Sequence, residues 1–84
     1  MKRVFLTSRA VTYAQRMERI LRKSGISAAI ERPELQLSES GCAYAVVISQ
    51  VYLPEAIEAL RKNGMTPVKV YIEEGFSEYR EIKL

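Results

Sequence analysis

Cys42 is the residue in this chain whose type and position best suit unusual chemistry, because it is the only cysteine and there is no histidine. It follows a stretch of small and polar residues at 38–41 and opens an apolar run at residues 43–48. Where a loop becomes a strand, the backbone can hold a thiol still while solvent reaches it. Because the thiolate is a good nucleophile, this position predicts nucleophilic sulfur chemistry.

The composition predicts one small domain without a disulfide or structural zinc. A chain of 84 residues with one cysteine can form no internal disulfide and offers no pair of zinc-binding cysteines. A lone thiol suits a reducing compartment. The apolar stretch at residues 4–6 is too short for a signal peptide or a membrane span. We therefore expect a cytoplasmic protein that has no membrane partner.

The charge is mild and unevenly distributed. Thirteen basic and ten acidic residues give a net charge of +3, which is too small to indicate a nucleic-acid-binding protein. The basic residues crowd the first third of the chain, at Arg9, Arg16, Arg19, Arg22 and Lys23. We interpret this cluster as the solvated face of a helix, which is the usual place for a run of charge.

A repeated pattern organises the chain. Residues 21–27 (LRKSGIS) reappear in similar form at residues 60–66 (LRKNGMT), and each copy has basic residues followed by glycine, as at a helix C-terminus. Apolar, β-prone segments flank both expected helices. The first helix is expected at residues 9–24, with Thr7 and Ser8 as N-cap candidates; the second begins near Pro54. Strands are expected at residues 3–7, 27–31, 43–49 and 67–73.

The βαββαβ order predicts an α+β domain, a ferredoxin-like plait with a four-stranded antiparallel sheet and both helices on one face. We assign residues 1–74 to this domain. Residues 75–84 are expected to form a tail, which is either a docking segment or an extra strand. In such a plait the start of the third strand and the end of the first lie at the same sheet end. Cys42 is therefore expected beside Ser8 and Arg9, where the first helix begins.

This corner could stabilise a thiolate. A helix N-terminus presents unpaired N–H groups and a partial positive charge, and Arg9 is expected to add a full charge in the first turn. Ser8 and Ser40 could donate hydrogen bonds, and Gly41 could adopt a tight turn with positive φ. The alternative is a small buried cysteine without reactivity, which is the commoner role of such a residue.

The chain resembles the selenium/sulfur carrier protein-like family of small bacterial proteins over roughly residues 4–72. The resemblance rests on an opening strand that ends at Ser8, the ERIL and KSGI segments at residues 18–21 and 23–26, a strand that ends at Pro33, the loop that ends in Cys42, and Asn63-Gly64 after the second helix. It implies that Cys42 accepts sulfur or selenium as a persulfide or selenylsulfide, from or for a donor or acceptor protein. The chain departs from the family pattern at Ala43, where glycine is common.

Two functions therefore stay open, a carrier with a reactive cysteine and a non-catalytic binding or regulatory module. The module would oligomerise through its open sheet face, where Tyr44, Tyr52, Tyr71 and Tyr79 could gather. We expect a homo-oligomer in either case. RNA binding is disfavoured because only Phe5 and Tyr44 could stack bases on the central strands. The absence of histidine and aspartate argues against a stand-alone enzyme, a metal site or a cofactor.

Overall fold

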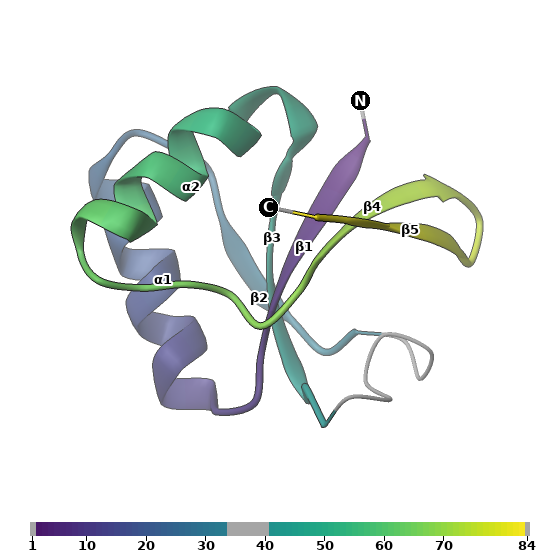
Figure 1. Ribbon diagram of the computed structural model, residues 1–84, viewed down its shortest axis with the longest axis horizontal. Coiled ribbons are helices and arrows are strands. Elements are labelled where there is room, and N and C mark those ends of the chain that lie inside the picture. The colour runs from purple at the N-terminus through teal and green to yellow at the C-terminus, as the bar shows by residue number, and fades with distance from the viewer. Residues whose placement is uncertain (1, 34–40, 84) are drawn as a thin grey trace.

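The computed structural model describes residues 2–33 and 41–83 as two helices over an antiparallel sheet (Figure 1). The helices are α1 (Val11–Lys23) and α2 (Leu53–Lys62), the second preceded by a 3-10 turn, η2 (Gln50–Tyr52). The strands are β1 (Arg3–Ser8), β2 (Ala29–Glu31), β3 (Tyr44–Ser49), β4 (Val70–Gly75) and β5 (Glu78–Ile82). They lie in the order β2-β3-β1-β4-β5, and each neighbouring pair is antiparallel.

The α+β class and the two helices are confirmed, but the expected number of strands is wrong. The sheet has five strands because the C-terminal segment folds back as β5 against β4. Of the two alternatives for this segment, the structure therefore contains the extra strand. No helix within the described ranges is long and apolar enough to cross a membrane.

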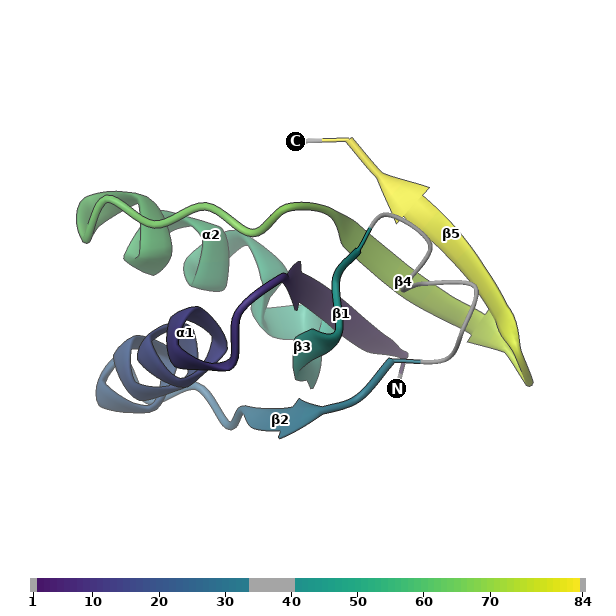
Figure 2. The ribbon, with the colours of Figure 1, turned by 90° about the horizontal axis from the view of Figure 1, so that it is seen from below.

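Apolar residues that alternate along the strands form the main core beneath the helices. β1 contributes Val4 and Leu6, and β3 contributes Val46 and Ile48. The helices supply a stripe at helical spacing, which on α1 consists of Ala14, Met17 and Leu21. Both helices lie on the same side of the sheet (Figure 2), so this single layer of side chains buries one face of each element.

A second, smaller cluster lies on the sheet face away from the helices. Phe5 is only 2% exposed there and packs with Ala45 and Val47. The ring of Tyr79 meets Phe5 edge-on, with centroids 5.5 Å apart and planes at 87°, and Tyr71 packs beside them. β5 thus covers part of the open face. Tyr44 instead packs against the main core, so the expected gathering of tyrosines on one face is wrong.

The repeated pattern corresponds to two helix ends with the same geometry. Gly25 and Gly64 have positive φ angles of 82° and 69°. After α1, the N–H of Ile26 donates to the carbonyl of Leu21 at 2.9 Å, and after α2 the N–H of Met65 donates to Leu60 at 2.9 Å. These are Schellman motifs, in which glycine accepts the left-handed conformation that ends the helix.

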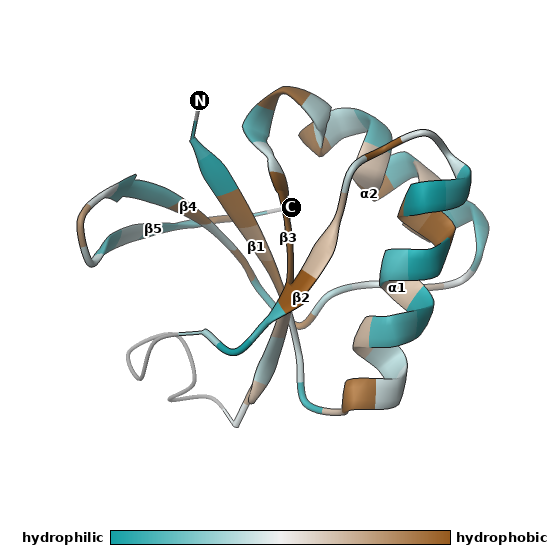
Figure 3. Cartoon of the chain, turned by 180° about the vertical axis from the view of Figure 1, so that it is seen from behind, coloured by the Kyte–Doolittle hydropathy of each residue, from teal (hydrophilic) through white to brown (hydrophobic). Residues whose placement is uncertain are grey.

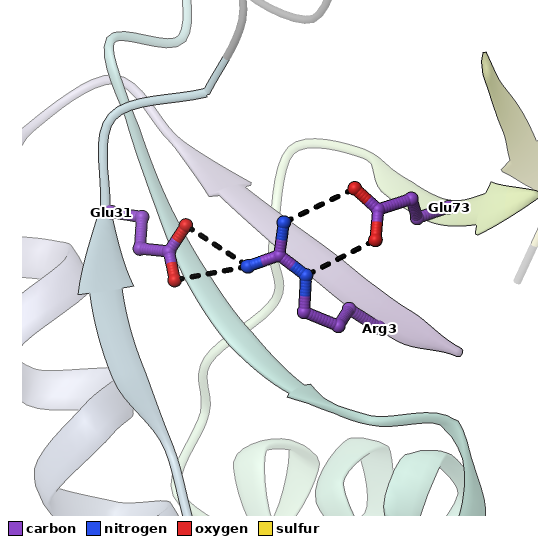
Figure 4. A network of polar contacts seen from close by, with 3 residues as sticks. All are labelled: Arg3, Glu31 and Glu73. Atoms are coloured by element: carbon purple, nitrogen blue, oxygen red, sulfur yellow. Dashed lines mark hydrogen bonds and ion pairs between the residues drawn. The ribbon is translucent and has the colours of Figure 1, made fainter. Parts of the chain in front are cut away.

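An ion network holds the strands together on the open face (Figure 4). From β1, Arg3 donates to both carboxylate oxygens of Glu73 on β4 at 3.1 Å, and to those of Glu31 on β2 at 3.2 and 3.3 Å. Its guanidinium also lies 5.1 Å from the centroid of the Phe5 ring. The hydrogen bonds from Arg3 hold the pKa of Glu73 below its ordinary value of 4.5.

We predict that Arg3→Gln lowers the free energy of unfolding at neutral pH by about 0.5–1 kcal/mol, because exposed ion pairs contribute little. The pKa of Glu73 is lower in the folded than in the unfolded chain, so its carboxylate favours folding above the unfolded pKa. This contribution is lost as the pH falls through the folded pKa. In chemical denaturation measured at a series of pH values, the difference in free energy of unfolding between wild type and Arg3→Gln should therefore become smaller below pH 4.5.

The matched control is Arg61→Gln, which removes an exposed pair with Glu58 on α2. Its effect at neutral pH should stay within about 0.5 kcal/mol. A difference between wild type and Arg3→Gln that stays constant from neutral to acidic pH would contradict the role assigned to the pair with Glu73.

Candidate functional site

The register of the central strands brings the start of β3 to the end of β1. The last pair between these strands joins Ser8 and Tyr44, and Cys42 lies two residues before Tyr44. The chain leaves β1 at this point and enters α1 at Val11. The segments around Cys42 and Ser8, which are far apart in the sequence, therefore meet at one corner of the sheet.

Gly41 and Arg9 meet at this corner. Gly41 has a φ of +84°, a conformation that other residues rarely adopt, so a glycine is needed there for the backbone itself. A Cβ atom at this position would lie 3.8 Å from Nε of Arg9. The guanidinium of Arg9 therefore lies against the residue that precedes Cys42. Arg9 is two residues before α1 and exposed, so its expected place in the first turn is wrong.

Cys42 itself is completely buried, at 0% exposure, between the exposed residues Gly41 and Ala43. The expectation that solvent reaches the thiol is therefore wrong. Cys42 is an even number of residues from Val46 and Ile48, which face the main core, and this spacing is consistent with a side chain that points inward. Among the described residues, Cys42 belongs to neither of the two apolar clusters.

The hydroxyl groups of Ser8 and Thr7 near the corner form hydrogen bonds with backbone groups. Ser8 is 1% exposed, and its Oγ donates to the carbonyl of Ala10 at 2.8 Å and accepts from the N–H of Ala10 at 3.2 Å. Thr7 Oγ1 donates to the carbonyl of Lys69 at 3.1 Å and accepts from its N–H at 2.9 Å. Neither is the N-cap of α1, which is Ala10 without a side-chain cap. Ser40, the remaining predicted site residue, lies outside the described residues.

Tyr13 is a feature of this region that the sequence did not indicate. Its hydroxyl accepts from the N–H of Thr66 at 2.8 Å and donates to the carbonyl of Thr66 at 3.1 Å, which fixes the α2–β4 connection to α1. A shallow depression of about 240 Å³ lies beside this contact. Its lining consists of Ser8, Arg9, Ala10, Tyr13, Thr66 and Val68, and Cys42 is not part of it.

The corner places a cation against the residue that precedes the thiol-bearing Cys42. Within residues 2–33 and 41–83 there is no group of three or more potential metal ligands. Arg9 supplies a permanent positive charge next to the segment that carries the thiol, and the first N–H groups of α1 start two residues later.

Comparison with known protein families identifies the chain. Residues 3–72 match the model of the family described as "Putative Se/S carrier protein-like". The match covers both helices and the strands from β1 into β4, and it includes Cys42. The chain therefore belongs to this family, as the sequence resemblance indicated. No curated protein and no solved structure matches the chain.

The burial of Cys42 leads to a prediction about its accessibility. In the folded chain, a bulky thiol reagent should modify Cys42 at least about tenfold more slowly than in denaturant, because modification has to wait for local opening. The measurement is the rate of chromogenic disulfide exchange, with free cysteine in each buffer as the control. Equal rates, after correction for the effect of denaturant on free cysteine, would show that the corner is open.

Proposed function

We propose that this protein carries sulfur or selenium on Cys42 as a persulfide or selenylsulfide. The observation that carries the proposal is the position of the chain's only cysteine, at a sheet corner where Arg9 lies against the preceding glycine. Membership of a family described as carrier-like supports it. We also propose a cytoplasmic location, because a lone thiol persists in a reducing compartment.

The transfer step conserves atoms and electrons. The Cys42 thiolate attacks the outer sulfur of a persulfide on a donor protein, a new S–S bond forms on Cys42, and the donor's inner sulfur leaves as a thiolate. The cargo is later passed to an acceptor thiolate by the same exchange in reverse. Because the chain has no second cysteine, it cannot release the cargo by forming an internal disulfide.

Each neighbour has a role in this proposal. Arg9, whose guanidinium lies against Gly41, stabilises the anionic sulfur of the neighbouring Cys42 by its positive charge. Gly41 supplies the left-handed turn that lets Arg9 approach. Ser8 is a positioning residue, because its hydroxyl fixes the turn between β1 and α1. Ser40, which precedes Gly41 in the sequence, is proposed as a hydrogen-bond donor to the loaded sulfur.

Because Cys42 is buried, we propose that the partner protein helps to expose its thiol. A buried thiol does not react readily with small molecules in bulk solution, so loading requires the corner to open. We propose that docking of the donor or acceptor favours the open state by contacting the corner. Burial would also protect a loaded persulfide from reductants between the two encounters.

We further propose that the fold is a ferredoxin-like plait to which β5 is added at the β4 edge. The basis is the strand order β2-β3-β1-β4 with both helices on one face. The alternative function, a binding module that oligomerises through the open sheet face, has less support. Phe5, Ala45 and Val47 on that face are already buried within the single chain, so little apolar surface is left for a second copy.

We predict that incubation with a cysteine desulfurase and cysteine adds the mass of one sulfur atom to the chain, and that a thiol reductant removes it. Intact-mass spectrometry measures the adduct. Cys42→Ser and Cys42→Ala should both lack it while keeping the wild-type circular dichroism spectrum. If the folded wild type gains no sulfur from an active desulfurase, or if the variants gain it equally, Cys42 is not the acceptor.

We also predict that Arg9→Gln slows formation of the adduct by about threefold to tenfold, since a nearby charge on a partly solvated group contributes about 1 kcal/mol. Arg9→Lys, which keeps the charge, should recover most of the rate. Arg61→Gln is the matched control on an exposed helix face away from the corner and should react like wild type. If Arg9→Lys slows adduct formation as much as Arg9→Gln does, the effect of Arg9 comes from packing and not from its charge.

A further inference from the structure

The positive charge of the chain is concentrated on α1. The helix contains four basic residues and one acidic residue, a net charge of +3 that equals the net charge of the whole chain. Outside α1, at least six of the nine described cations form ion pairs with carboxylates, whereas Arg32 and Lys62 form none with a described residue. Ion pairs join Lys2 and Arg80 to Glu74, Arg3 to Glu31 and Glu73, Arg61 to Glu58, and Lys69 and Lys83 to Glu81.

Three cations on α1 differ from this pattern. Among the described residues, no side chain forms an ion pair or hydrogen bond with Arg16, Arg19 or Lys23. All three are exposed. Arg16 and Lys23 lie three residues before and four residues after Arg19, a spacing that puts them on one side of the helix. This side is opposite the buried stripe of Ala14, Met17 and Leu21, and Figure 3 shows hydrophilic residues on successive turns of α1.

The flank of this basic face is hollowed. A shallow depression of about 580 Å³ is lined by Gln15, Glu18, Arg19, Arg22 and Lys23. Arg22 is fixed there, because its Nε and Nη2 donate to the carbonyl of Ala28 at 3.1 and 3.0 Å and it pairs with Glu18 at 3.4 Å. A carboxylate that enters the depression would meet three cations, one of them already held in place.

The charge and shape of this face suit an acidic protein surface. The three unpaired cations extend over roughly 10 Å of helix axis, whereas a duplex is bound through a larger number of phosphate contacts. No aromatic residue lies among them to stack a base. Thr12 and Gln15, which lie four residues before Arg16 and Arg19, are exposed and polar. This side of the helix therefore offers no apolar face to enter a lipid surface.

We propose that the basic face of α1, formed by Arg16, Arg19 and Lys23 with Arg22 at its flank, docks an acidic surface of the protein that exchanges sulfur or selenium with this chain. The inference rests on the proposed carrier function and names the chemistry of its partner. α1 begins at the corner that holds Cys42, so a partner that extends from Lys23 to the first turn of the helix, over roughly 18 Å, would reach that corner. Exposed charge pairs of this kind increase the rate of encounter and weaken with salt.

The test is the binding of a fluorescently labelled oligo-glutamate peptide, measured by anisotropy at low and at physiological salt. A triple variant, Arg16→Gln, Arg19→Gln and Lys23→Gln, should weaken binding at low salt by at least about tenfold. The matched control, Lys69→Gln, Arg80→Gln and Lys83→Gln, removes the same charge from the residue before β4, from β5 and from the residue after β5. It should weaken binding by no more than about threefold. Gln resembles Arg and Lys in helix propensity, so α1 should remain folded.

Three results would overturn the proposal. They are no binding of the peptide to wild type, equal losses in the two triple variants, and a labelled DNA oligonucleotide or anionic vesicles that bind more tightly than the peptide through the same residues. Cys42→Ser should bind the peptide like wild type. The experiment therefore separates the two proposals. If sulfur loading fails while peptide binding is intact, the carrier function is rejected. If loading is normal but peptide binding is not selective for the α1 cations, the docking face is rejected.

Discussion

The antiparallel pairing of β1 with β3 is the constraint on which the rest of the structure depends. Val4 and Leu6 face the helices, while Phe5 faces the opposite cluster, so both sides of β1 are buried. A shift of one residue would turn every one of these side chains to the wrong face. The same pairing sets Ser8 opposite Tyr44 and thereby fixes where Cys42 meets the start of α1. Stability and the placement of the thiol thus follow from one register.

Some charged residues form ion pairs between strands, whereas others on α1 have no partner among the described residues. Arg3 joins β1 to β2 and β4 on the open face. Elsewhere on the sheet, Glu74 accepts from both Lys2 and Arg80, whose hydrogen bonds lower its pKa. These pairs use most of the acidic residues near the C-terminus to neutralise cations on adjacent strands. On α1, Arg22 pairs with Glu18 and no described carboxylate pairs with Arg16, Arg19 or Lys23. A modest net charge therefore conceals a strongly polarised surface.

Local patterns in the sequence were sufficient for both helices, for four of the five strands and for two details of the fold. The repeated glycine after basic residues identified both helix ends, because a left-handed residue leaves few alternatives to glycine. The βαββαβ order brought Cys42 and Ser8 to one sheet end. β5 was only one of two alternatives, since its residues alternate between charged and apolar without a strong strand signal. The burial of Cys42 depends on tertiary contacts, which local propensity does not encode. The Tyr13–Thr66 contact joins residues 53 positions apart, which no local pattern reveals.

Two side-chain hydroxyl groups beside the corner, those of Thr7 and Tyr13, constrain how the corner can move. Thr7 holds both backbone groups of Lys69, and Tyr13 holds both backbone groups of Thr66, so the segment between α2 and β4 is attached to the end of β1 and to α1. A displacement of the first turn of α1 must either break the two bonds of Tyr13 or pull that segment along, which in turn strains the two bonds that Thr7 makes from β1. Exposure of the sulfur atom by such a displacement is then a collective rearrangement of two distant stretches of chain, with a free-energy cost set far from the cysteine.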